Sequence, residues 1–221
     1  RPNELWMEFS SVVWWNDVSL WDEYLRSAKT VLGDLLIKLD QNDPARRKAD
    51  TATGEGKFIA KFGPREESRW LLGRFEQTKI WFTLQIYKNG GNSTGRRRDN
   101  NILFTTPENL HTSGCIQYLV ELFCLTTERL GIFYAFADLK RMCSRAKKTS
   151  PPSYSLNSAS DLLGVSWLTY FGPHYCEFFG RERLDSLKQL SDGPAGGVTL
   201  RLAKTPSQVP DGLRQMMERR L

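Results

Sequence analysis

The chain has 221 residues, of which 40% are hydrophobic and 12% aromatic, and its net charge is +6. This size and apolar content predict a single domain over residues 1–221, with a weak division near residues 149–160, a stretch rich in proline and serine. No run of about 18 apolar residues and no basic segment leading into an apolar one occurs, so we expect a cytoplasmic protein without a membrane contact.

Charge and cysteine usage narrow the protein class further. Residues 1–50 carry a net charge of −2 and the remainder +8. A basic region can serve a partner such as nucleic acid, but it is more often a solvated surface, because charge governs solubility first. The cysteines lie far apart in apolar neighbourhoods, which predicts free thiols rather than a disulfide framework. They are Cys115, Cys124, Cys143 and Cys176.

The first half of the chain predicts a strand, a long helix and an antiparallel meander. Leu5–Val13 is rich in strand formers. From Leu20 to Leu39, apolar residues recur three and four positions apart, which predicts one amphipathic helix with Ser19 as its N-cap. Beyond a polar loop, strict alternation over Ile80–Tyr87 predicts a strand with two unlike faces, and Ile102–Thr105 predicts its neighbour across a long hairpin tip.

The second half alternates between helical and strand-like patterns. Helices are expected at Ser113–Glu128, Leu139–Ala146, Pro173–Phe179, Glu182–Leu190 and Leu213–Leu221, and strands at Gly131–Phe136, Val165–Phe171 and Val198–Leu202. Strands with short connections, punctuated by helices, predict an α+β domain whose mostly antiparallel sheet is flanked by helices.

The sequence contains no complete catalytic or metal-binding motif. His111, Cys115, His174 and Cys176 could supply zinc ligands, but the paired cysteine spacings usual for zinc are missing. The segment at Ser166 lacks the second glycine of a nucleophile elbow. We therefore predict no catalytic residue, no metal site and no cofactor.

A faint nuclease pattern remains as an alternative. Glu55, Gly56 and Lys57 follow Asp40 and Asp43, an arrangement in which carboxylates could hold Mg²⁺ while the lysine stabilises developing charge. Glycines flank Glu55, however, whereas a metal ligand needs rigid support. A metal-dependent enzyme is thus the disfavoured reading.

Two blocks carry a resemblance to a known family. One is Gly56–Asn89; the other runs from Gly164 to the C-terminus and includes Trp167-Leu168-Thr169-Tyr170, Gly180, Gly196-Gly197-Val198 and Pro206. In these blocks the chain resembles the immunity protein 52 family of bacterial polymorphic-toxin and type VI secretion immunity proteins. The resemblance implies a protein without catalytic activity that binds and neutralises a cognate toxin protein, with a nuclease of restriction-endonuclease-like fold as the implied toxin.

The basic charge bears on how such a toxin would be bound. Antidotes to nucleases are often acidic, because they complement a basic cleft. Three explanations stay open: the acidic N-terminal part docks, the toxin is bound away from its nucleic-acid cleft, or the toxin is not a nuclease. A basic module that binds nucleic acid is the alternative function.

Toxin-binding residues are expected in the loops that should be most exposed. These are the corner before the long helix, the polar loop after it and the hairpin tip. The candidates are Trp14, Trp15, Asp17, Asp40, Asp43, Asp50, Arg96, Arg97 and Arg98.

Overall fold

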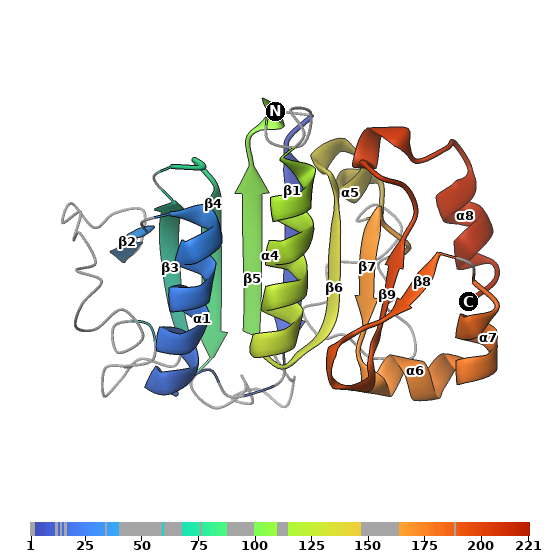
Figure 1. Ribbon diagram of the computed structural model, residues 1–221, viewed down its shortest axis with the longest axis horizontal. Coiled ribbons are helices and arrows are strands. Elements are labelled where there is room, and N and C mark those ends of the chain that lie inside the picture. Colours follow the sequence, from blue (N-terminus) through green and yellow to red (C-terminus); the bar gives the residue numbers. More distant parts are fainter. Residues whose placement is uncertain are drawn as a thin grey trace.

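The strands assemble into one nine-stranded sheet in which all neighbouring strands are antiparallel (Figure 1). The computed structural model describes residues 3–11, 13, 15, 17–33, 35–39, 59, 68–75, 77–87, 100–109, 115–146, 164–187 and 189–221. Across the sheet the order is β2 (Leu35–Leu39), β3 (Ser68–Phe75), β4 (Trp81–Tyr87), β5 (Asn100–Thr106), β1 (Leu5–Ser11), β6 (Ile132–Leu139), β7 (Leu168–Phe171), β9 (Val198–Arg201) and β8 (Leu190–Asp192). The predicted α+β class with an antiparallel sheet is confirmed.

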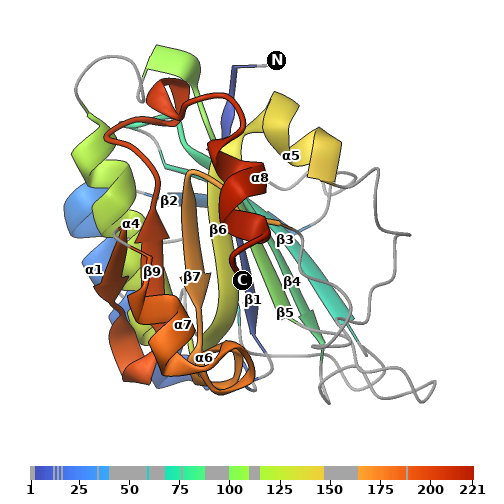
Figure 2. The same ribbon diagram turned by 90° about the vertical axis from the view of Figure 1, so that its right-hand side faces the viewer.

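Helices lie on both sides of the sheet. They are α1 (Val18–Leu32), α4 (Ile116–Arg129), α5 (Lys140–Ala146), α6 (Pro173–Phe179), α7 (Arg181–Asp185) and α8 (Leu213–Glu218). Helices α1 and α4 lie side by side on one face, α5 lies on the other face beside β6 and β1, and α8 lies at the end of the sheet that β7, β9 and β8 form (Figures 1 and 2). None of the described helices combines the length and apolar character that crossing a bilayer requires.

Alternation along the strands determines which side chains meet α1 and α4. On β1, Phe9 points to this side: its ring lies 5.2 Å from that of Phe123 on α4 and 5.8 Å from that of Phe104 on β5. Successive strand residues point to opposite faces, so Phe82, paired with Phe104, shares the helix-covered side. The side chains that face α1 and α4 therefore form a continuous aromatic and aliphatic core.

The long helix predicted over residues 20–39 is shorter in the structure. It ends at Leu32, where Gly33 takes φ +84° and donates its N–H to the carbonyl of Lys29. Leu35–Leu39 instead forms edge strand β2, paired with β3. A run of apolar residues satisfies helical spacing and a strand equally well, so the pairing partner decided between them.

Two further local predictions need correction. Asp17, and not Ser19, caps α1: its carboxylate accepts the Ser19 N–H at 2.8 Å. The helix predicted over residues 182–190 stops at Asp185, and Leu190 begins β8. The capping carboxylate lies two residues before the N–H that it accepts, and Leu190 is held in β8 by its pairing with Leu200 on β9; helical spacing reveals neither.

Gly73 on β3 makes room for the ring of Phe82, its partner on β4. A Cβ at residue 73 would lie 2.0 Å from a ring carbon of Phe82. We expect Gly73→Ala to lower the free energy of unfolding by about 1–3 kcal/mol, because the buried ring has to shift. Urea unfolding monitored by circular dichroism measures the change.

The double variant Gly73→Ala/Phe82→Leu is the control, since the smaller side chain should recover part of the loss. Equal stability of Gly73→Ala and the parent protein would contradict this packing argument.

Candidate binding surface

The face of β3, β4 and β5 that points away from α1 and α4 carries large exposed aromatic side chains. Trp70 is 54% exposed and Trp81 is 39% exposed. Their neighbours on this side are half-buried, unlike the fully buried residues between them in sequence. We call this surface the tryptophan face; it comprises Trp70, Leu72, Arg74, Trp81, Thr83, Gln85, Leu103 and Thr105.

Cations stack on indole rings along one row of this side of the sheet. Arg74 and Trp81 are directly paired across β3 and β4, and the Arg74 guanidinium carbon lies 5.3 Å from the centre of the Trp81 ring. The row continues through Thr105 to Trp6 on β1, whose ring lies 4.8 Å from Nζ of Lys140. Such cation–aromatic contacts orient the rings and keep positive charge at the surface.

Charges of both signs occur at the tryptophan face. Arg74 lies on it and the exposed Lys79 lies in the turn at 77–80, while half-buried Glu8 on β1 is paired with Leu103 of the face. Lys79 is exposed and has φ +59°, a conformation uncommon for a residue with a side chain. The turn thus displays a cation two residues before Trp81.

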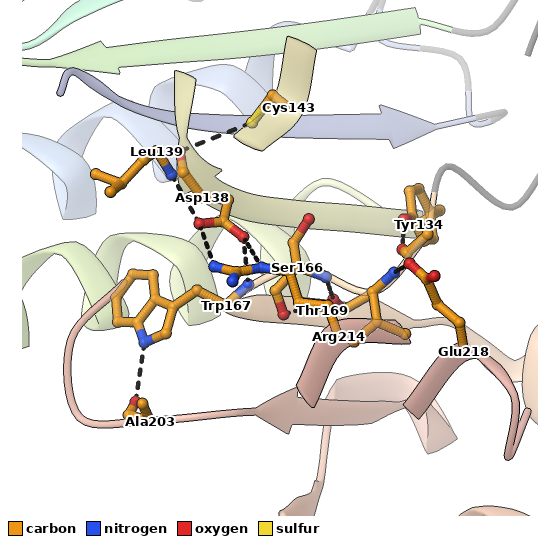
Figure 3. A network of polar contacts seen from close by, with 12 residues as sticks. Tyr134, Asp138, Leu139, Cys143, Ser166, Trp167, Thr169, Ala203, Arg214 and Glu218 are labelled. Carbon is orange, nitrogen blue, oxygen red and sulfur yellow. Dashed lines mark hydrogen bonds and ion pairs between the residues drawn. The ribbon is translucent and has the colours of Figure 1, made fainter. Parts of the chain in front are cut away.

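A second polar cluster lies around the buried carboxylate of Asp138 at the end of β6 (Figure 3). Arg214 on α8 binds it with two hydrogen bonds of 2.8 Å each. The backbone N–H groups of Leu139 and Trp167 donate to the same carboxylate at 2.8 and 3.0 Å. Four donors therefore occupy the acceptor positions of one carboxylate, two on each oxygen.

This cluster holds the C-terminal helix against the sheet. Besides Arg214, Glu218 on α8 accepts the Val165 N–H at 2.9 Å, and the hydroxyl of Tyr134 donates to the carbonyl of Gly164 at 3.1 Å. With no acceptor position left, Asp138 cannot take a proton from a substrate without breaking this attachment. The arrangement is that of a structural ion pair rather than of a general base.

Removing Arg214 would leave the Asp138 carboxylate buried without its counter-charge. We expect Arg214→Ala to lower the free energy of unfolding by about 3–5 kcal/mol and to speed hydrogen exchange in α8. Urea unfolding and hydrogen exchange by mass spectrometry measure both effects.

Arg181 supplies the matched control for that substitution. It pairs with Asp185 and Asp192 at 2.8 and 2.6 Å but is half exposed, so water can replace its partners. A loss of stability for Arg181→Ala as large as that for Arg214→Ala would argue against a special role of the buried pair.

The predicted toxin-binding residues fall into two groups. Trp15 was expected in an exposed corner, but it is fully buried and its indole N–H donates to the carbonyl of Leu130 at 2.9 Å. The exposure prediction for Trp15 is therefore wrong, because the indole fills the space between α1 and the end of α4. Asp17 is exposed, as expected, and serves as the cap of α1. The remaining candidates lie outside the described residues: Trp14, Asp40, Asp43, Asp50, Arg96, Arg97 and Arg98.

Sequence reasoning missed Trp70, Arg74 and Trp81 as surface residues. The alternation over Ile80–Tyr87 contained part of the signal, since Trp81 shares a face with threonine and glutamine. Trp70 lies in a stretch whose pattern suits a helix or a strand, so its face could be assigned only from its pairing with β4.

The positions of the cysteines can be compared with the zinc site considered from the sequence. No cluster of three or more possible metal ligands occurs within the described part of the chain, and His111 lies outside it. The described chain shows all four cysteines as free thiols. Burial raises the pKa of the Cys176 thiol, whose Sγ lies 3.5 Å from the carbonyl oxygen of Phe171. A protonated thiol of this kind is a poor nucleophile and metal ligand.

Burial also raises the pKa of Tyr24, Tyr134 and Tyr170, for Tyr170 to about 12. An unfolded chain ionises its tyrosines near about pH 10. These groups therefore contribute stability in full below about pH 10; the contribution of Tyr170 is lost as the pH rises through about 12, and those of Tyr24 and Tyr134 are lost at still higher pH. We expect tyrosinate absorbance to rise at higher pH in the native protein than in urea, with a smaller difference for Tyr170→Phe; coinciding titrations would contradict this.

Comparison with known proteins shows that this chain is similar in fold to a solved structure. No family model and no curated protein matches the chain, so membership of the immunity protein 52 family stays a prediction. A solved structure, the Pseudomonas aeruginosa T6SS protein PA0821, is similar with a TM-score of 0.55 and 13% sequence identity. The match covers 90% of this chain and 64% of that chain, so this chain spans less than two thirds of PA0821.

Proposed function

We propose that this protein is an immunity protein, which binds a cognate secreted toxin and neutralises it through protein–protein contact without a reaction of its own. The toxin would belong to a type VI secretion system. The likeness of fold to PA0821, whose description names such a system, supports this context. The sequence resemblance to the immunity protein 52 family supports the antidote role.

The observation that carries the proposal is the number of large aromatic side chains at the surface. Trp70, Trp81, Tyr118 and Phe178 are each between 39% and 55% exposed. Exposing such rings to water costs free energy unless a partner covers them. Tryptophan and tyrosine are also the residue types that most often dominate binding energy in protein interfaces.

A protection experiment tests the proposed function directly. A bacterial host would produce the toxin domain encoded in the gene beside that of this protein, with and without this protein. We expect growth to stop without it and to continue with it, because a bound toxin cannot act. Isothermal titration calorimetry with a catalytically inactive toxin domain would measure the complex.

The same host with the inactive toxin domain is the control and should grow in both cases. Growth arrest that this protein does not relieve, together with no heat of binding, would contradict the immunity function. Turnover of any compound by the purified protein, lost on changing one side chain, would contradict it as well.

A further inference from the structure

We infer that the C-terminal helix α8 is a clasp, which opens and closes as one unit together with residues 164–167 while the sheet stays folded. The ion pair of Asp138 and Arg214 is the latch of this clasp, and Glu218 with the N–H of Val165 is its second polar contact (Figure 3). The inference is independent of the proposed function, since it concerns a movement built into the fold.

The C-terminal arm, residues 203–221, is attached without backbone pairing to the sheet. Leu202, just after β9, still donates its N–H to the carbonyl of Trp167, just before β7, at 3.0 Å. From residue 203 onward the backbone-to-backbone hydrogen bonds among the described residues are local, such as that from Met216 to Gly212. Segments that lack such pairing are the ones that open at a lower free energy than the whole protein.

The attachment of α8 comes from side chains on one face of a six-residue helix. Arg214 and Glu218 make the polar contacts, and Met217 is fully buried in the core. These positions are three and four residues apart, so they project to the same side of the helix. One movement of α8 therefore withdraws all three side chains from their partners.

The latch favours two distinct states. Asp138 is 1% exposed and Arg214 is 17% exposed, and both hydrogen bonds between them measure 2.8 Å. A partly withdrawn Arg214 would leave the carboxylate buried without its counter-charge, which is costly, whereas full opening lets water hydrate it. The clasp is therefore closed or open, without a stable position between these states.

Glycines allow both the closed contact and the movement. A Cβ at Gly164 would lie 2.5 Å from Oε1 of Glu218, so this residue has to be small for the glutamate to reach the N–H of Val165. Gly212 precedes α8 and has φ +78°, a conformation that glycine enters and leaves at little cost. Gly212 is thus the hinge at the start of the helix.

Residues 164–167 belong to the same unit because both ends of this segment depend on the clasp. Val165 is bound to Glu218, while Trp167 donates its backbone N–H to Asp138 at 3.0 Å and its indole N–H to the carbonyl of Ala203 at 2.9 Å. In the open state these N–H groups and the Asp138 carboxylate meet water together. A ligand that bound them would favour the open state, since only that state presents them.

Amide hydrogen exchange of the full chain, measured by nuclear magnetic resonance at increasing urea concentration, tests the clasp. We expect the amides of Val165, Trp167 and Met216 to open at least about tenfold more often than that of Phe9 on β1, and with a weaker urea dependence, because little surface is exposed. Equal opening and equal urea dependence would show that α8 opens only with the sheet, and would overturn the inference.

Two substitutions distinguish one unit from separate contacts. We expect Arg214→Ala to speed the exchange of Val165 about 100-fold, although its acceptor Glu218 is still present. Glu218→Ala should speed the exchange of Trp167 about tenfold, although its acceptor Asp138 is still present. Acceleration confined to the amide that lost its own neighbour would mean independent contacts, and the clasp would be wrong.

Arg220→Ala is the matched control, because it removes an exposed arginine just beyond α8. It should leave all of these exchange rates within about twofold. If Arg214→Ala does not fold, as judged by circular dichroism, Arg214→Lys serves instead. Lysine keeps the charge but not the forked geometry, so we expect Val165 to exchange about tenfold faster. An unchanged Val165 in this variant, or an equal effect of Arg220→Ala, would overturn the latch.

Discussion

Strand β1 forms backbone hydrogen bonds along both of its edges, to β5 on one side and to β6 on the other. The meander β2–β5 and the C-terminal group β6–β9 meet only through this strand in the described sheet. Strand β1, near the start of the sequence, is therefore the central strand. The sheet becomes continuous only when β6, more than 100 residues later in the sequence, pairs with it. The side chain of Phe9 on β1 also links separate parts of the core, because its ring packs against Phe104 on β5 and Phe123 on α4.

The two sides of the sheet then acquire different roles. One side receives α1 and α4, and its aromatic residues pack edge to face in a continuous core. On the other side α8 is attached near β6 by the buried pair of Asp138 and Arg214, at a distance along the sheet from β3 and β4. This division leaves indoles exposed on β3 and β4, while the polar network attaches α8 to β6, next to the central strand. The candidate binding surface and the structural ion pair thus do not compete for the same residues.

Much of the fold could be predicted from local patterns. The strand Ile80–Tyr87, the helix Pro173–Phe179 and the antiparallel α+β class follow from alternation, helical spacing and short connections, and all are found. The candidate surface could be predicted much less well. Trp15 was expected outside and is buried, whereas Trp70 and Trp81 are exposed among the tryptophans that the structure describes. A loop-like corner suggests exposure, but the packing of α1 against α4 draws Trp15 inward to its partner carbonyl on Leu130.

The amino-acid sequence by itself determined which segments have two unlike faces, since periodicity is a property of neighbouring residues. Only the tertiary structure decided which face each segment buries, which strands become neighbours, and that Leu35–Leu39 is a strand rather than the end of a helix. Three tryptophans show the reason. Trp15, Trp70 and Trp81 have the same side chain, yet one is enclosed and two meet water. Burial depends on the elements that pack above a residue, and in this protein those come from distant parts of the chain.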